Sequence, residues 1–279
     1  MAGRRMWARP AGLRRDQVAR CICVSAVWAL GLQVGCGGPA PLPPRAQQLL
    51  DQAREAYARG DDVTAIGQAD ILLREYRPGG RAELEAVYYR GRARFRAGSD
   101  QLAARDLQQV AESQGEPALA ASAKIVLGDL AAENDQLAQA RRWYQAALER
   151  TEARSHPTDY AMFRLGCLLQ RMGQWDQADL YLARLVHVFG ETELARQAGD
   201  RLNATAWTLR AGAYEQPAEA EQAAARWQGR SLPASVRAVW RQGRPQLWVC
   251  LGRFDTDEQA RQARQHSQAP TDLTITVVD

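Results

Sequence analysis

Cysteine and histidine are both scarce in this chain, and their arrangement excludes several kinds of chemistry. Five cysteines and three histidines occur in 279 residues. No two cysteines form a C-x-x-C pair, so the usual signatures of a zinc site and of a thioredoxin-type redox site are missing. The histidines, His156, His187 and His266, have no nucleophile or metal-ligand partner at a useful spacing. The sequence therefore predicts neither a metal nor a cofactor.

Phosphate-binding loops of the Walker or dinucleotide type are also missing from the sequence. A pair of carboxylates that cleaves a glycosidic bond would leave no sequence pattern, because any two acids can meet in a fold. No segment has an arrangement built for catalysis, and we expect a protein that is not an enzyme.

The first thirty-five residues combine a basic head with an apolar run. Residues 1–20 carry six arginines and one acid, Asp16, and residues 21–35 carry no charge. The run is too short to span a bilayer comfortably, so the pattern predicts a secretory signal. Removing it takes a net charge of +5 from the whole chain's +4 and leaves −1. No basic tail or patch remains, which argues against nucleic acid as a partner.

The predicted signal ends at Leu32-Gln-Val-Gly-Cys36. This segment resembles the lipobox of bacterial lipoproteins, in which the cysteine receives a diacylglycerol group and becomes the new N-terminus. Gln33 stands where the lipobox usually has an aliphatic residue. The resemblance implies lipidation of Cys36 and a periplasm-facing, lipid-anchored protein of the cell envelope, and Gly37 implies the outer membrane. The alternative is an uncleaved or ordinarily cleaved signal.

Residues 36–44, which include the run GGPAPLPP, cannot continue a helix and predict a semi-rigid tether. Beyond the tether two cysteines remain, Cys167 and Cys250. They fall in different predicted domains, and nothing in the sequence brings them together. A disulfide bridge between them stays an open but weak alternative.

Residues 45–205 have helical periodicity almost throughout, and the pattern repeats. Four alanines, each a few residues after a turn, recur at intervals of 38, 37 and 38 residues: Ala65, Ala103, Ala140 and Ala178. About twelve residues before each stands another small residue: Ala53, Gly91, Gly128 and Gly166. Small residues at both places let two helices approach closely, and the turn joins the helices antiparallel.

This pattern resembles the tetratricopeptide repeat, which has small residues at its eighth and twentieth positions. The resemblance covers four units: residues 46–78, 84–114, 121–154 and 159–190. It implies an α-solenoid that is closed by a capping helix over residues 191–204. The period exceeds the 34 residues of the family, so longer loops between repeats are expected.

Repeats of this kind offer a concave face built from the first helix of each pair. Helical spacing places ten side chains on that face: Leu50, Arg54, Tyr57, Tyr88, Arg92, Phe95, Ile125, Asp129, Phe163 and Cys167. We expect a groove for a protein partner with five anchors: Arg54, Tyr57, Tyr88, Arg92 and Phe95. The alternative is that most of these aromatic side chains fill the core between helices.

In residues 206–279 the helical periodicity gives way to a mixture of strand and helix patterns, and one sequence pattern occurs twice. Residues 207–214 (WTLRAGAY) and 247–254 (LWVCLGRF) are each a β-prone run ending in glycine, one residue and an aromatic, followed by an Ala-rich helical stretch. Strands are predicted over 207–211, 234–240, 246–251 and 272–278, and helices over 217–228 and 256–266. The order βαββαβ places both helices on one side of a four-stranded sheet and leaves the other side uncovered.

The doubled phrase, the Leu232-Pro-Ala segment and the Asp/Glu-Gln-Ala-Arg run of the last helix resemble the SPOR (sporulation-related repeat) domain. The fold class is then α plus α/β, an α-solenoid followed by a small βαββαβ domain. The resemblance implies binding to septal peptidoglycan whose glycan strands have lost their stem peptides, and with it a role in cell division. Arg210 and Arg253 replace a glutamine and a proline of the family pattern.

Alternation along the predicted strands divides the sheet into two faces. The helix-covered core receives Leu209, Ala211, Val236, Ala238, Leu247, Val249, Leu251, Leu273, Ile275 and Val277. The other face, called the open face below, receives Thr208, Arg210, Ser235, Arg237, Val239, Gln246, Trp248, Cys250, Thr274 and Thr276.

Seven open-face side chains make up the predicted glycan site: Thr208, Arg210, Arg237, Gln246, Trp248, Thr274 and Thr276. A sugar chain presents flat C–H faces and hydroxyls, so Trp248 is expected to be an exposed stacking platform. Arg210 and Arg237 are expected to pair with the lactyl carboxylate of muramic acid that has lost its peptide. The alternatives are that the helical array covers Trp248, that Arg237 is a solvated cross-strand charge, and that Cys250 is a small filler.

The sequence thus predicts a non-catalytic envelope lipoprotein that binds peptidoglycan through its C-terminal domain and an unidentified envelope protein through its repeats. A rival hypothesis is a protein-assembly scaffold whose C-terminal domain binds protein rather than glycan. A third, a lipoprotein that activates a wall hydrolase, keeps both domains and differs only in the partner.

Overall fold

The computed structural model describes residues 41–149, 156–229, 231–241, 244–267 and 273–279. The predicted signal and Cys36 lie outside the described residues. Residues 41–279 form one compact unit. The two remaining cysteines, Cys167 and Cys250, are both free thiols, so the bridge that the sequence left open is not formed.

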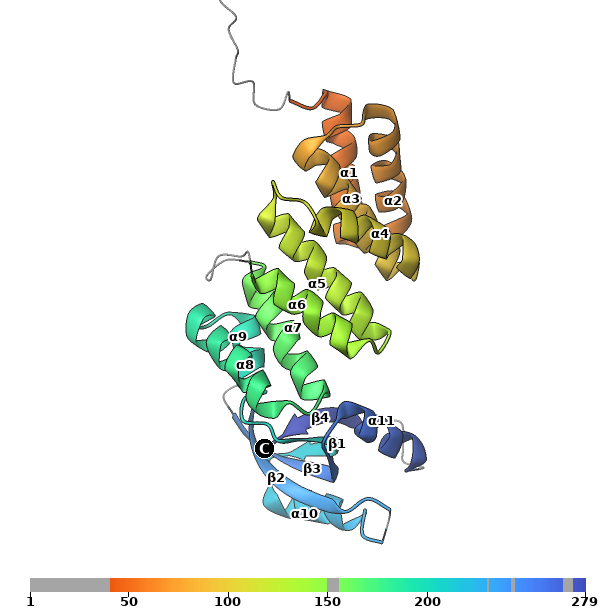
Figure 1. Cartoon of the computed structure of the whole chain (residues 1–279). Helices are drawn as coiled ribbons and strands as arrows, with labels where there is room; N and C mark the ends of the chain where they lie inside the picture. Colours follow the sequence, from red (N-terminus) through yellow and green to blue (C-terminus); the bar gives the residue numbers. More distant parts are fainter. Residues whose placement is uncertain (1–40, 150–155, 230, 242–243, 268–272) are drawn as a thin grey trace, which may run out of the picture. The chain divides into compact units, whose positions relative to one another are not determined.

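The N-terminal part of this unit is a series of antiparallel helix pairs (Figure 1). The pairs are α1 (Pro44–Arg59) with α2 (Asp62–Ile71), α3 (Gly80–Arg96) with α4 (Asp100–Ala111), α5 (Pro117–Glu133) with α6 (Leu137–Leu148), and α7 (Thr158–Arg171) with α8 (Trp175–Phe189). A short π-helix, η1 (Leu72–Tyr76), extends α2. Each helix packs on the next one along the chain, which confirms the predicted solenoid.

The small residues lie where the helices of a pair touch. A Cβ built on Gly128 would lie 2.4 Å from Cε1 of Tyr144, and one on Gly166 would lie 2.7 Å from Cδ2 of Leu182. Tyr144 and Leu182 each stand four residues after the alanine of their repeat. In the first pair both equivalent positions, Ala53 and Ala69, are fully buried alanines. In the repeats that have glycine on the first helix, the second helix places a large side chain against it. In the first repeat, alanine on the first helix faces alanine on the second.

The turns inside the pairs repeat with the same period as the alanines. One residue in each turn has a left-handed backbone: Gly60 (φ 85°), Gly98 (φ 74°), Asp135 (φ 55°) and Gly173 (φ 70°). Glycine adopts this conformation at little cost, whereas an aspartate is strained in it. The third turn thus has the same backbone geometry as the others, although its left-handed residue is an aspartate and not a glycine.

The predicted capping helix over residues 191–204 is shorter in the structure. Helix α9 covers Glu193–Gly199, and the Oγ1 atom of Thr192 accepts a hydrogen bond from the backbone N–H of Ala195 at its start. Glycine ends the helix, and Asn203, at φ 59°, turns the chain toward the first strand. The buried side chains of Ala195 and Ala198 still pack toward the last pair, so α9 closes the apolar end of the array.

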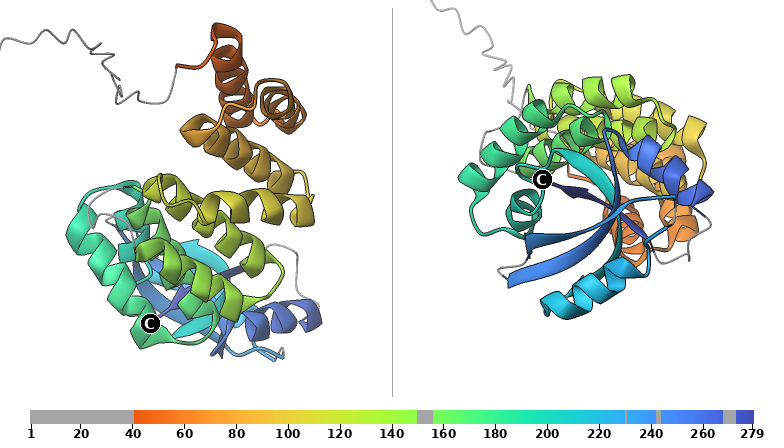
Figure 2. Two further views of the ribbon diagram at one scale, coloured as in Figure 1. Left: turned by 45° about the horizontal axis from the view of Figure 1, so that its top comes forward. Right: turned by 90° about the horizontal axis from the view of Figure 1, so that it is seen from below.

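The C-terminal domain has the predicted βαββαβ order. Its elements are β1 (Ala206–Tyr214), α10 (Pro217–Ala225), β2 (Ala234–Arg241), β3 (Arg244–Phe254), α11 (Asp257–His266) and β4 (Thr274–Val278). The strands lie in the order β2-β3-β1-β4, and every neighbouring pair is antiparallel. Alanines of α10 and α11 pack on one core with Leu209 and Leu251, so both helices cover the same face of the sheet (Figure 2).

The predicted core side chains pack against these helices, with one exception. Ala238 is exposed. On this edge strand, residues of α10 lie beside Ala234 and Val236 but not beside Ala238.

The sequence pattern that occurs twice, glycine followed two residues later by an aromatic, is explained by packing. A Cβ on Gly212 would lie 2.7 Å from the ring of Tyr214, and one on Gly252 would lie 2.5 Å from that of Phe254.

Among the described residues, no helix has both the length and the apolar character that a membrane span requires. In the same part of the chain, no group of three or more His, Cys, Asp or Glu side chains is placed to hold a metal ion.

Candidate functional site

The open face of the sheet is curved. Trp248, on β3, is 3% exposed and clusters with Val239 of β2 and Val278 of β4. Because β2 and β4 are the two edges of the sheet, both edges must bend over the middle strands. The β1–β3 pairing contains two register shifts, and such bulges increase local bend and twist.

This curvature contradicts part of the predicted glycan site. Trp248 is not an exposed stacking platform, because it is 3% exposed and packs in a cluster of buried side chains that includes Val239 and Val278. Thr208 is 1% exposed, and its Oγ1 donates a hydrogen bond of 2.9 Å to the backbone oxygen of Gly252. Strand alternation places both side chains on the open face, but it cannot show that the sheet closes over them.

The two arginines of the open face lie on the strands either side of β3. The Arg210 guanidinium carbon lies 4.7 Å from the centre of the Trp248 ring, so the buried indole supports the cation from below. Arg237 pairs with Trp248 in the β2–β3 register, and its Nη1 donates to the backbone oxygen of Asp279 at 2.9 Å. Burial raises the pKa of the Cys250 thiol, and the charges of both arginines oppose that rise.

Five of the seven predicted glycan-site residues keep part of their side chain at the surface: Arg210, Arg237, Gln246, Thr274 and Thr276. Thr274 lies opposite Arg210 in the β1–β4 register. The Oε1 atom of Gln246 accepts a hydrogen bond of 3.0 Å from Nε1 of Trp248. The surface of the open face is therefore polar and cationic, and the apolar side chains lie beneath it.

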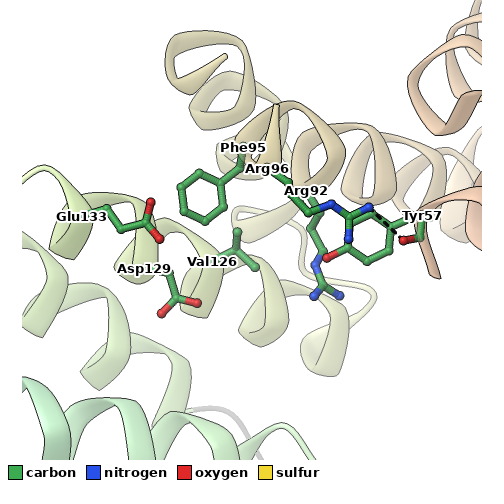
Figure 3. A pocket seen from close by; sticks show the side chains of 7 residues that line it. All are labelled: Tyr57, Arg92, Phe95, Arg96, Val126, Asp129 and Glu133. Carbon is green, nitrogen blue, oxygen red and sulfur yellow. Dashed lines mark hydrogen bonds between the residues drawn. The ribbon is translucent and has the colours of Figure 1, made fainter. Parts of the chain in front are cut away.

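The first helices of the pairs form two neighbouring hollows, together called the partner groove below. One, of about 340 Å³, is lined by Tyr57, Arg92, Phe95, Arg96, Val126, Asp129 and Glu133 (Figure 3). The other, of about 350 Å³, is lined by Tyr88, Arg92, Ser122, Ile125, Val126, Asp129, His156, Pro157 and Tyr160. Arg92, Val126 and Asp129 belong to both hollows and lie where they meet.

Arg92 is the central cation of the partner groove. Its guanidinium carbon lies 4.5 Å from the centre of the Tyr57 ring and 5.4 Å from that of Tyr88. Its Nη1 also donates to the Tyr88 hydroxyl at 3.3 Å. Among the described residues Arg92 forms no ion pair, whereas Arg96, 4.3 Å from the same Tyr57 ring, is bound to Asp62.

Asp129 faces the groove but is already neutralised. Its Oδ1 accepts hydrogen bonds of 2.6 Å from the Tyr144 hydroxyl and from Nε of Arg164. Burial and the Asp129 carboxylate both raise the pKa of Tyr144. Burial lowers the pKa of Arg164, but the Asp129 carboxylate raises it by more, so the pKa of Arg164 lies above its usual value. Among the described residues, the groove charges without an ion pair are the cation of Arg92, where the two hollows meet, and the carboxylate of Glu133 in one of them.

The structure brings together four of the five predicted anchors: Tyr57, Tyr88, Arg92 and Phe95. Arg54 lies on the ring of Tyr89, 5.8 Å from its centre, and lines neither hollow. Tyr88 is 8% exposed and packs in a core cluster, so the core-filling alternative holds for this aromatic side chain, and Leu50 and Ile125 of the same predicted face are buried as well. Sequence reasoning missed Arg96, although it follows Arg92 by one helical turn.

Residues 203–269 match the family model of the SPOR domain. No curated protein sequence matches this chain closely enough to count as a relative. Three solved structures resemble its helical part. MamA is 17% identical, with 56% of this chain and 82% of that one covered and a TM-score of 0.42.

A tetratricopeptide repeat protein of Parabacteroides merdae is 16% identical, with 57% and 59% covered and a TM-score of 0.46. A thermophilic one of Thermus thermophilus is 19% identical, with 55% and 78% covered and a TM-score of 0.42. Likenesses this distant decide nothing by themselves, and the helix pairs, turns and small-residue contacts identify the repeats. The chain therefore carries four repeats of the tetratricopeptide type followed by a SPOR domain, a combination that gives a protein of the cell envelope a binding or scaffold role.

Proposed function

We propose that this protein binds peptidoglycan glycan strands that have lost their stem peptides, through the open face of its SPOR domain. The observation that carries the proposal is the family match over residues 203–269 together with two arginines on the polar surface of that sheet. The helical array holds a protein partner at the same time. The protein acts as a non-catalytic link in the envelope, at sites of cell division.

The chemistry of a stripped glycan strand suits the open face. Muramic acid without its peptide exposes a lactyl carboxylate, and a guanidinium binds a carboxylate with two parallel hydrogen bonds. Among the described residues Arg210 forms no ion pair, and the Trp248 ring fixes its position. Gln246, Thr274 and Thr276 supply short polar groups for sugar hydroxyls, while Trp248 and Thr208 support the surface from within.

Pelleting of the full chain with amidase-treated cell-wall sacculi tests this proposal. Binding should increase when stem peptides are removed, and Arg210→Ala should weaken it by about tenfold, as expected for loss of a charge-assisted contact. Arg226→Ala, which removes an exposed arginine directly after α10 on the other side of the sheet, is the matched control. No pelleting under either condition would favour the protein-scaffold alternative instead.

The partner side of the proposal rests on the partner groove. Arg92 and the aromatic rings around it suit an acidic group flanked by apolar side chains. Arg92→Ala should abolish co-purification of an envelope protein without loss of helicity. Arg54→Ala is the matched control, since Arg54 lies on the same face but outside both hollows. Equal recovery of the partner with both variants would count against the groove.

The proposal also includes a lipid anchor at Cys36 and a place in the outer membrane, supported by the lipobox resemblance. Metabolic labelling with palmitate should mark the full chain and leave Cys36→Ser unlabelled. Labelling of both proteins, or of neither, would contradict lipidation at this residue.

A further inference from the structure

Strand β2 is one edge of the sheet, and the backbone groups that it turns outward follow from its pairing. The backbone N–H of Gly252 donates to the carbonyl oxygen of Pro233 at 2.9 Å. In an antiparallel pair, hydrogen-bonded and non-hydrogen-bonded residue pairs alternate. The unbroken β2–β3 register therefore turns the N–H and C=O groups of Ala234, Val236 and Ala238 away from β3. Within the described part of the chain, none of these groups has another hydrogen-bond partner.

β2 lacks the features that usually protect a free edge. Between Ala234 and Trp240 it contains no proline, its pairing with β3 contains no bulge, and its only charged residue is Arg237. The Arg237 guanidinium is bonded to the backbone oxygen of Asp279. β4, the other edge of the sheet, has five residues against eight in β2. β2 is therefore the edge to which another strand can pair.

The helix-covered side of β2 has a groove at one end of the strand and an exposed indole at the other. The groove, of about 470 Å³, lies between the end of α10 and the start of β2 (Figure 1). Its apolar lining includes Trp227, Leu232 and Val236. Alternation places Trp240 on the same side of the strand as Val236, and its side chain is 65% exposed.

A two-fold axis through Val236 brings these two features together. In an antiparallel pair of β2 strands with Val236 opposite Val236 of the second copy, Ala238 lies opposite Ala234. In the same register Trp240 lies opposite Leu232, which lines the groove. Because the two-fold axis makes the contact identical for both copies, each indole meets the groove of the other copy.

The charges near β2 favour the same register. With Val236 on the axis, Arg237 of one copy lies opposite Ser235 of the other. Moving the axis by one residue would place the two Arg237 side chains directly opposite each other, and like charges at such positions are destabilising. The two ends of the contact also carry opposite charges on exposed side chains, Glu221 in the groove and Arg244 at the end of the hairpin. The axis brings each of these ends to the other.

We infer that β2 is a dimerisation edge: a second copy of this chain pairs its own β2 antiparallel to it, and Trp240 of each copy occupies the groove of the other. The axis is perpendicular to the sheet, so both open faces lie on the same side of one continuous sheet. The inference goes beyond the proposed function and does not depend on the ligand that the open face binds.

Sedimentation equilibrium of residues 41–279, the compact unit without the predicted signal, tests the dimer. The unchanged protein should approach twice the monomer mass as its concentration rises. Trp240→Ala should weaken the dimer by at least about tenfold, since a buried aromatic anchor contributes on that scale. Leu180→Ala, which removes a 71% exposed side chain of α8, is the matched control and should leave the dimer unchanged. An unchanged protein that stays monomeric would overturn the inference and leave the edge to a strand of another protein.

Ala238→Pro and a pair of cysteine variants test the register without Trp240. Ala238→Pro removes an outward N–H, which an edge strand tolerates, and should abolish the dimer with unchanged circular dichroism. Val236→Cys should form a disulfide-linked dimer on oxidation, because the Cα atoms of a hydrogen-bonded pair lie about 5.5 Å apart. Ala238→Cys should not, because in this register it lies opposite Ala234 and not opposite itself.

Two results would overturn the inference even if the protein dimerises. One is a dimer of Ala238→Pro as strong as that of the unchanged protein, since the contact would then lie elsewhere on the surface. The other is cross-linking of Val236→Cys that does not exceed that of Ala238→Cys, since the two strands would then not be paired about Val236.

Discussion

The indole nitrogen of Trp207 donates a hydrogen bond of 2.8 Å to the backbone oxygen of Gln170, and this contact joins the SPOR domain to the last helix pair. Gln170 is fully buried, and its side-chain amide exchanges two hydrogen bonds of 2.8 Å with Arg201. Beside it, Nε of Arg171 binds the carboxylate of Asp257 at the start of α11. Buried polar groups are paired across this junction, so the two domains are held in one arrangement.

Trp207→Phe should destabilise this junction. The change keeps most of the buried ring but leaves the Gln170 carbonyl without its partner, which costs about 1–2 kcal/mol of unfolding free energy. Urea unfolding followed by circular dichroism measures the loss. Trp175→Phe is the matched control, because Trp175 contacts the Trp207 ring at 6.2 Å between centres and is half-buried. Equal losses in both variants would show that the hydrogen bond does not matter.

Gly128→Ala should destabilise the helical array. The added Cβ would lie 2.4 Å from the Tyr144 ring, and the hydrogen bond from Tyr144 to Asp129 prevents the ring from moving away. Overpacking of this kind costs about 1–3 kcal/mol. The midpoint of urea unfolding should fall accordingly.

Gly67→Ala is the control for the same substitution in a helix. Nothing lies within 4 Å of a Cβ at Gly67, so alanine should stabilise α2 by roughly 0.5–1 kcal/mol through its better helix propensity. A stabilised Gly128→Ala protein would refute the close-contact role of the repeat glycines.

Asp106→Asn should cost more than the loss of a surface ion pair. The Asp106 side chain is 7% exposed and receives hydrogen bonds from both Arg90 and Arg94 of the preceding helix. Removing its charge leaves Arg90 and Arg94 with Asp70 as their remaining ionic partner, and the loss of charged hydrogen bonds costs about 1.5–3 kcal/mol.

The comparison is Glu55→Gln, which breaks an exposed pair with Arg59 and should change stability by less than about 0.5 kcal/mol. Thermal or urea unfolding of the two variants gives the difference. Similar stabilities would mean that the Asp106 network contributes no more than the surface pair.

The thiols of Cys167 and Cys250 should react slowly in the native protein. Burial raises the pKa of both, so less thiolate is present at pH 8.5 than in an unfolded chain. Each thiol's contribution to stability is complete below its unfolded pKa and is lost as the pH rises through the higher folded value. Ellman's reagent, applied with and without urea to a Cys36→Ser chain, measures the reactivity. Rapid reaction without urea would contradict the burial of these side chains.

Sequence patterns alone were sufficient to predict the helices and strands and the close contacts between small residues of paired helices. The spacing of Ala65, Ala103, Ala140 and Ala178 indicated the helix pairs, because close helix packing demands small residues at fixed intervals. Strand alternation placed Trp248 and Arg210 on one face of the sheet, since successive side chains point to opposite sides.

The tertiary structure alone decided which of these side chains reach the surface. Trp248 is buried because it packs in one cluster with Ala206, Val239 and Val278 of the three other strands, an arrangement that no single strand contains. The partner groove also needs side chains of α1, α3 and α5, which are close only in the folded chain. Sequence determines periodic patterns because they are local, whereas exposure depends on contacts between residues that are far apart along the chain.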